Sequence, residues 1–121
     1  MRADSIIFIG IISSALKIML RTRKISEDDL KTMAEEIRIK LSELNMSIEN
    51  RRFLYIVFSN KEPTDSSMDL KTLKFAFHLF YEKCCEFMGP IETDKVISMA
   101  LQKASEKDEA LDFDPRDFLK S

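Results

Sequence analysis

The sequence predicts an all-α fold, a small bundle of four main helices in a single helical domain over residues 1–121. Apolar residues recur at steps of three and four along most of the chain, which is the period of an α-helix and not that of a strand. Only two glycines and three prolines are present, too few for the turns of a β-sandwich or barrel. The scarcity of glycine also excludes glycine-rich phosphate-binding loops.

The first helix is expected at about 5–21, over the most apolar stretch of the chain, Ile6 to Leu20. This stretch is shorter than the roughly 20 residues that cross a bilayer, and no signal-peptide cleavage site follows it. We therefore expect a buried helix, with a dimer-interface helix and a membrane element as alternatives. Small and polar residues form one narrow stripe along it: Gly10, Ser13, Ser14, Lys17 and Arg21. Gly10 and Ser14 would let another helix approach closely.

The second helix, at about 27–45, has a clear N-terminal signature. Ser26 is a good N-cap, and the acidic residues 27–29 favour the positive end of the helix dipole. Ile25 can pack against Leu30 as a hydrophobic staple.

The apolar segment 53–58, FLYIVF, is ambiguous. Its aromatic and β-branched residues are typical of a buried strand, but Ser47 could cap a short helix that runs through it. We favour the helix because a single strand would lack partners for its backbone groups.

The third main helix, at about 69–88, has an apolar surface wider than one bundle face, and we expect it to be the central helix. Gly89 can cap its C-terminus, and Pro90 prevents its continuation. A fourth helix follows at about 91–105. Asp114 and Pro115 predict a short C-terminal helical turn that carries Phe118.

No residue set in the chain matches a catalytic, cofactor or metal site. His78 is the only histidine, and with Glu82 and Cys85 it offers at most three ligands on one helix face, whereas structural zinc needs four. Cys84 and Cys85 are near a helix C-terminus, where the dipole disfavours a thiolate. We therefore expect no enzyme activity, no cofactor and no metal.

Charge is distributed unevenly along the chain, although the net charge is only −2. Residues 1–24 carry five basic and one acidic side chain, and acidic residues are concentrated after Ser105. This basic head and acidic tail could attract one another, within one chain or between two. Two adjacent cysteines without a disulfide framework favour a reducing, cytoplasmic location.

The segment Leu79 to Ala104 contains a helix corner, Phe87-Met88-Gly89-Pro90-Ile91, between two helices. It is similar to a small helical module appended to some bacterial and archaeal signalling proteins. That resemblance covers this segment alone and implies a regulatory interaction role.

The strongest functional signal is apolar surface in excess of what one small bundle can bury, which a second copy of the chain would cover. We expect a non-enzymatic protein interaction or regulatory module that forms a homodimer. The expected interface residues are Gly10, Ser14, Phe53, Tyr55, Phe58, Phe75 and Leu79.

One alternative function is that of a carrier with an apolar ligand in its Phe- and Met-rich core. The other is a nucleic-acid-binding regulator that uses the basic clusters at 21–24 and 51–52. The partner could also be a protein other than a second copy of the chain.

Overall fold

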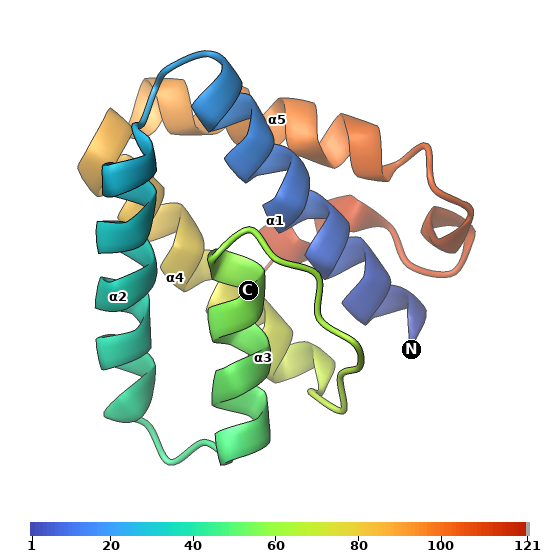
Figure 1. Ribbon diagram of the computed structural model, residues 1–121. Helices are drawn as coiled ribbons and strands as arrows, with labels where there is room; N and C mark the ends of the chain where they lie inside the picture. Colours follow the sequence, from blue (N-terminus) through green and yellow to red (C-terminus); the bar gives the residue numbers. More distant parts are fainter. Residues whose placement is uncertain (121) are drawn as a thin grey trace.

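The computed structural model describes residues 1–120 and is helical throughout, which confirms the all-α class (Figure 1). It has five α-helices instead of four, followed by two short 3-10 helices, and residues 1–120 contain no strand. The elements are α1 (Ala3–Arg21), α2 (Glu27–Ser42), α3 (Ile48–Phe58), α4 (Leu70–Met88), α5 (Pro90–Ala104), η1 (Asp108–Leu111) and η2 (Pro115–Leu119).

The ambiguous segment 53–58 is the C-terminal half of helix α3, so the strand alternative is wrong. Ser47 has an extended backbone, and its hydroxyl accepts a hydrogen bond from the backbone N–H of Asn50 at 3.1 Å. Helix α2 ends at Ser42, earlier than predicted, and the backbone is non-helical at Ser47, as an N-cap requires. The capping box expected at Ser26 is present, with Asp29 as its reciprocal partner.

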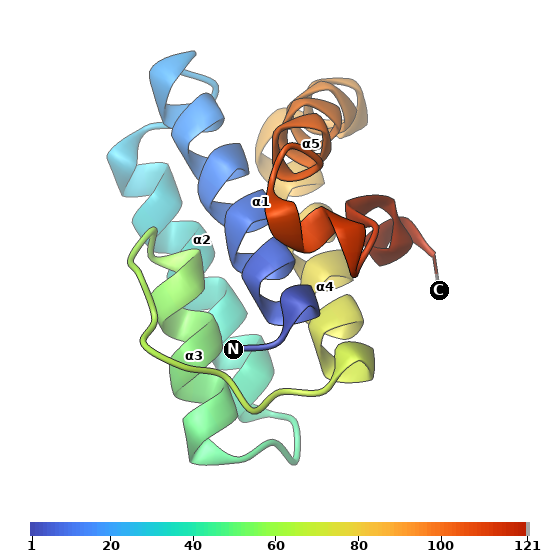
Figure 2. The ribbon, with the colours of Figure 1, turned by 90° about the vertical axis from the view of Figure 1, so that its right-hand side faces the viewer.

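Helix α1, and not α4, is the centre of the bundle. It runs between the α2–α3 pair on one side and the α4–α5 pair on the other (Figure 2). It contacts α3, α4, α5 and both 3-10 helices. Most of its apolar residues are buried, including Phe8, Ile12 and Leu16 at zero exposure. The wide apolar surface of α1 is therefore covered within one chain.

Helix α1 also meets the length and composition criteria for a membrane-crossing helix, a test that buried core helices pass as well. Half of its most apolar window (50%) is buried inside the fold.

Phenylalanine rings connect the helices across the core. Phe8 of α1 lies 6.3 Å from Phe58 of α3 and 5.8 Å from Phe118 of η2, measured between ring centroids. Phe58 stacks on Phe80 of α4 at 5.5 Å. Phe118 also lies 5.8 Å from Phe77, and all five rings are almost fully buried. The predicted C-terminal turn is thus a structural part of the core and closes one end of it.

The helix corner at Gly89 is built as predicted. Gly89 has a φ of 83°, a conformation that side-chain-bearing residues rarely adopt, and Pro90 starts α5. Across this corner, the hydroxyl of Tyr81 on α4 donates a hydrogen bond to the carboxylate of Asp94 on α5.

The acidic stretch after α5 is partly ordered as η1, which the sequence did not predict. Backbone N–H groups of Ala110 and Phe113 donate to the carbonyls of Lys107 and Glu109, each at 3.1 Å. Phe113 packs on Phe118 with ring centroids 5.1 Å apart, and η1 contacts α1. The acidic tail is therefore held beside the basic N-terminal helix.

We predict that Phe118→Ala lowers the free energy of unfolding by about 3–5 kcal/mol, the usual cost of truncating a buried phenylalanine. Leu119→Ala is the matched control, because its side chain is 50% exposed in the same turn, and it should cost about 0.5 kcal/mol or less. Urea unfolding followed by circular dichroism measures both. Equal losses for the two variants would contradict the role given to Phe118.

Candidate functional site

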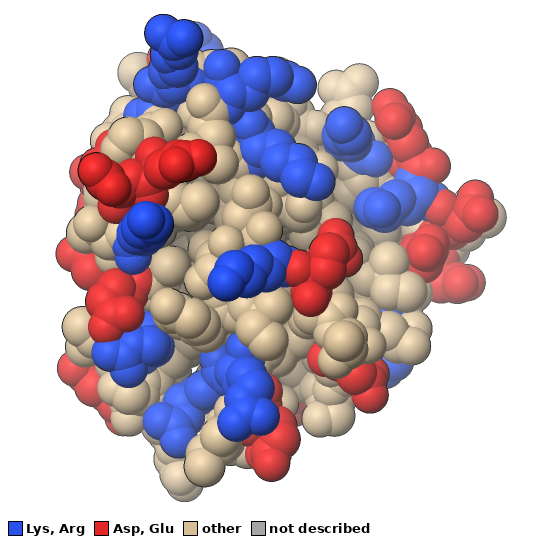
Figure 3. Space-filling model, viewed as in Figure 1, with Lys and Arg blue, Asp and Glu red and all other residues tan. Residues whose placement is uncertain are grey.

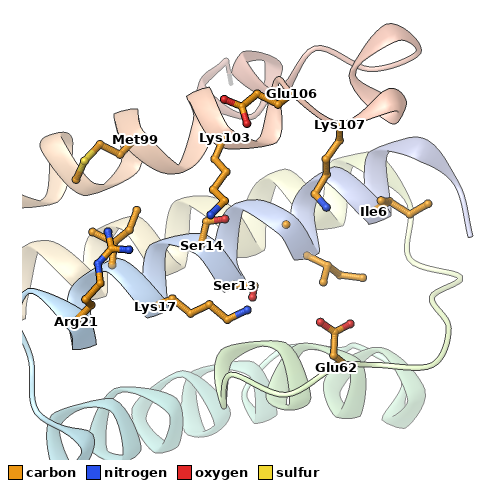
Figure 4. Close-up of a pocket in the computed structure, with 13 residues that line it drawn as sticks. Ile6, Ser13, Ser14, Lys17, Arg21, Glu62, Met99, Lys103, Glu106 and Lys107 are labelled. Atoms are coloured by element: carbon orange, nitrogen blue, oxygen red, sulfur yellow. The ribbon is translucent and has the colours of Figure 1, made fainter.

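An open groove of about 740 Å³ lies between α1 and α5 (Figure 4). One wall is the stripe of small and polar residues on α1, and the other is the flank of α5 with the turn after it. Glu62, in the loop after α3, points toward the groove from a third direction. The lining residues are Ile6, Ile9, Gly10, Ser13, Ser14, Lys17, Ile18, Arg21, Glu62, Met99, Lys103, Glu106 and Lys107.

Gly10 has no side chain, which leaves room at one end of the groove for a lysine side chain to cross it. A Cβ atom at residue 10 would lie 2.8 Å from Cε of Lys107, closer than real carbon atoms approach. The Lys107 side chain therefore rests over the glycine, and Lys103 extends from α5 toward α1 beside it (Figure 4).

The groove carries four cations, Lys17, Arg21, Lys103 and Lys107, against two carboxylates. None of these six groups forms an ion pair with any residue from 1 to 120. Unpaired like charges that converge on one depression create a positive potential, which favours an anionic ligand or an acidic protein surface. Figure 3 shows basic side chains on this face and acidic ones gathered at its right-hand edge, where η1 follows α5.

The structure separates the interface residues expected from the sequence into three groups. Gly10 and Ser14 line the groove. Phe53, Phe58 and Leu79 are buried in the core of the single chain. Tyr55 and Phe75 are exposed, at 40% and 46%, on α3 and α4. The groove thus contains two of the seven expected interface residues, and lysine side chains line it beside them.

Four charged residues of the groove were missed by the sequence reasoning: Glu62, Lys103, Glu106 and Lys107. Met99 and Lys103 are four residues apart and share one flank of α5, whereas Lys107 lies in the turn beyond Ala104, where that helix ends. The four-residue spacing of Met99 and Lys103 was the available sign that these side chains share a surface. The sequence did not show that α5 packs against α1.

A second cleft, of about 440 Å³, lies between α4 and α5 and contains His78, Tyr81 and Asp94. Nε2 of His78 is buried without a hydrogen-bond partner among residues 1–120. The hydrogen bond to Asp94, together with burial, raises the pKa of the Tyr81 phenol from 10.0 to about 12. A phenol with a raised pKa stays protonated and is a poor general base at neutral pH. We therefore assign the Tyr81–Asp94 hydrogen bond a structural role, which is to link α4 to α5.

The cysteines and the acidic residues do not gather into a metal site in the described part of the chain. Burial raises the pKa of the Cys84 thiol far above its usual range, which keeps it protonated and inert. Cys85 is half-buried and also free. No group of three His, Cys, Asp or Glu side chains is placed to hold a metal ion within residues 1–120.

The two basic clusters considered for nucleic acid lie at opposite ends of the bundle. Residues 21–24 begin at Arg21, the last residue of α1, whereas Arg51 and Arg52 are near the start of α3 (Figure 1). They do not form one continuous surface.

Comparisons with protein-family models, curated proteins and solved structures find no match to this chain.

We predict that Gly10→Ala leaves the fold intact and raises the free energy of unfolding by up to about 1 kcal/mol, because alanine is favoured over glycine inside a helix. The new methyl group displaces only the flexible end of Lys107. Urea unfolding measures the change. A loss of stability of more than about 1 kcal/mol would show that Lys107 is held rigidly over Gly10.

We also predict that Asp94→Ala lowers the pKa of the Tyr81 phenol from about 12 toward 10.0, because the carboxylate hydrogen bond is its main cause. Ultraviolet titration in a Tyr55→Phe background reports Tyr81 alone, since the chain has two tyrosines. Glu36→Ala, an exposed acid on α2, is the control.

The same pair predicts a pH dependence of stability. The unfolded phenol loses its proton near pH 10.0 and the folded one near 12, so the stabilisation is complete below pH 10.0 and is lost as the pH rises through about 12. The stability difference between the wild type and Tyr81→Phe should therefore shrink over that window. A difference that stays constant across it would contradict the assignment.

Proposed function

We propose that this protein is a non-enzymatic interaction module with a regulatory role, that it forms a homodimer, and that the α1–α5 groove is its contact surface. The observation that carries the proposal is the set of four unpaired cations around one groove. Charges left without partners in the monomer are available to a partner surface of opposite sign.

The floor of the groove also favours contact with a protein. Ser13 and Ser14 have short side chains, so a chain segment can approach the backbone of α1 closely beside the Lys107 side chain that covers Gly10. Apolar side chains of Ile9 and Met99 border the lysines, and Met99 is 46% exposed. An apolar strip with a charged border is the usual composition of a protein interface.

An apolar-ligand carrier is less well supported, because the Phe-rich core is filled by its own side chains. Phe58 and Phe80 stack directly, and Phe8 and Phe77 both pack against Phe118 ring to ring. Nucleic-acid binding is also less well supported, because the clusters at 21–24 and 51–52 lie far apart on the surface.

Size-exclusion chromatography with light scattering tests the proposal. The wild type should elute with twice the chain mass of 14.1 kDa, and the dimer should weaken as salt is added. The double variant Lys17→Glu, Lys103→Glu should be monomeric with an unchanged circular dichroism spectrum, since both lysines are exposed and unpaired.

The matched control is Lys40→Glu, Lys71→Glu, which changes the charge equally at exposed positions outside the groove. It should remain dimeric. A wild type that is monomeric at every concentration would disprove the homodimer. A control that dissociates like the groove variant would show that net charge, and not the groove, governs association.

A further inference from the structure

The acidic turn η1 presents one apolar side chain to solvent. Leu111 is 91% exposed, the highest value for any large apolar residue in residues 1–120. Acidic residues surround it in the chain: Asp108, Glu109 and Asp112. Their side chains form no hydrogen bond or ion pair within the described part of the chain. Ala110 and Phe113, in contrast, pack on the core.

The turn is fixed in place and does not fill the groove of its own chain. Its backbone hydrogen bonds to Lys107 and Glu109 and the Phe113–Phe118 contact hold it against α1. Leu111 nevertheless points to solvent, although Lys107 at the groove edge is only four residues earlier. An ordered, exposed leucine between carboxylates is a ready anchor for a complementary surface.

The groove is complementary to this turn in both charge and polarity. The four unpaired cations of the groove outnumber its two carboxylates, Glu62 and Glu106, so the groove is net positive, whereas the turn carries three unpaired carboxylates. Ile6, Ile9 and Met99 offer an apolar lining to Leu111. The turn is adjacent to the groove, because it begins directly after Lys107, which lines the groove. A surface whose two halves are complementary can pair with itself through a two-fold axis, which closes the assembly at two chains.

We propose that the acidic turn Asp108–Asp112 of one copy docks in the α1–α5 groove of a second copy, with Leu111 as the apolar anchor, and that the exchange is reciprocal. This inference rests on the proposed function and specifies its partner surface. Each groove is completed by residues that only the other copy supplies.

A charge-swap experiment tests this arrangement. The groove variant is Lys17→Glu, Lys103→Glu, and the turn variant is Asp108→Lys, Asp112→Lys. Each should be monomeric alone, because both of its contacts pair like charges. Mixed at equal concentration they should form a heterodimer, because both contacts then pair opposite charges. Native mass spectrometry distinguishes the heterodimer from either homodimer by mass.

The anchor is tested separately with Leu111→Ala, which should weaken the wild-type dimer by at least about tenfold through lost apolar burial. Leu119→Ala, another exposed leucine outside the groove and the turn, is the control. Circular dichroism of each variant confirms that it is folded.

The outcomes separate the two proposals. A dimeric wild type whose turn variant also stays dimeric would overturn the docking of η1 and leave the homodimer standing, as would two monomeric variants that do not associate when mixed. A monomeric wild type would end both proposals. A ladder of larger assemblies would overturn the reciprocal, two-fold exchange.

Discussion

The fold depends on covering helix α1 on nearly every side. An apolar helix that is not confined to a membrane needs neighbours around most of its circumference, because exposed apolar surface is unfavourable in water. Here α3, α4, α5 and the two 3-10 helices together provide that cover. The one stripe they leave open is the stripe of small and polar residues, and it becomes the floor of the groove. The same constraint therefore shapes both the core and the candidate site.

Local signals in the sequence were sufficient for most of the fold. The N-cap at Ser26, the Gly89-Pro90 corner and the helical period of α4 are short-range features, and each appears as predicted. The segment 53–58 was ambiguous because it has the composition of a strand, and its cap at Ser47 was the signal for the helix that forms. The central helix, in contrast, was misassigned. Helices α1 and α4 both have a wide apolar surface, and that width does not determine which of them lies at the centre of the bundle.

The candidate site was only half accessible from the sequence. The stripe from Gly10 to Arg21 is visible in the helical period of α1, but Lys103 and Lys107 reach it from the other end of the chain. Pairing of distant helices is decided by packing, which leaves no local pattern to read. The burial of Phe53, Phe58 and Leu79 has the same origin, since aromatic and aliphatic side chains suit a core and an interface equally well.

The contact between Phe8 and Phe118 joins residues from near the two ends of the chain. Phe118, which completes the cover of α1, lies in the sequence after all five α-helices. Until these two segments meet, the apolar surface of α1 is only partly covered, which makes a partly folded chain vulnerable to aggregation. Contacts of such long sequence separation also slow the search for the native state.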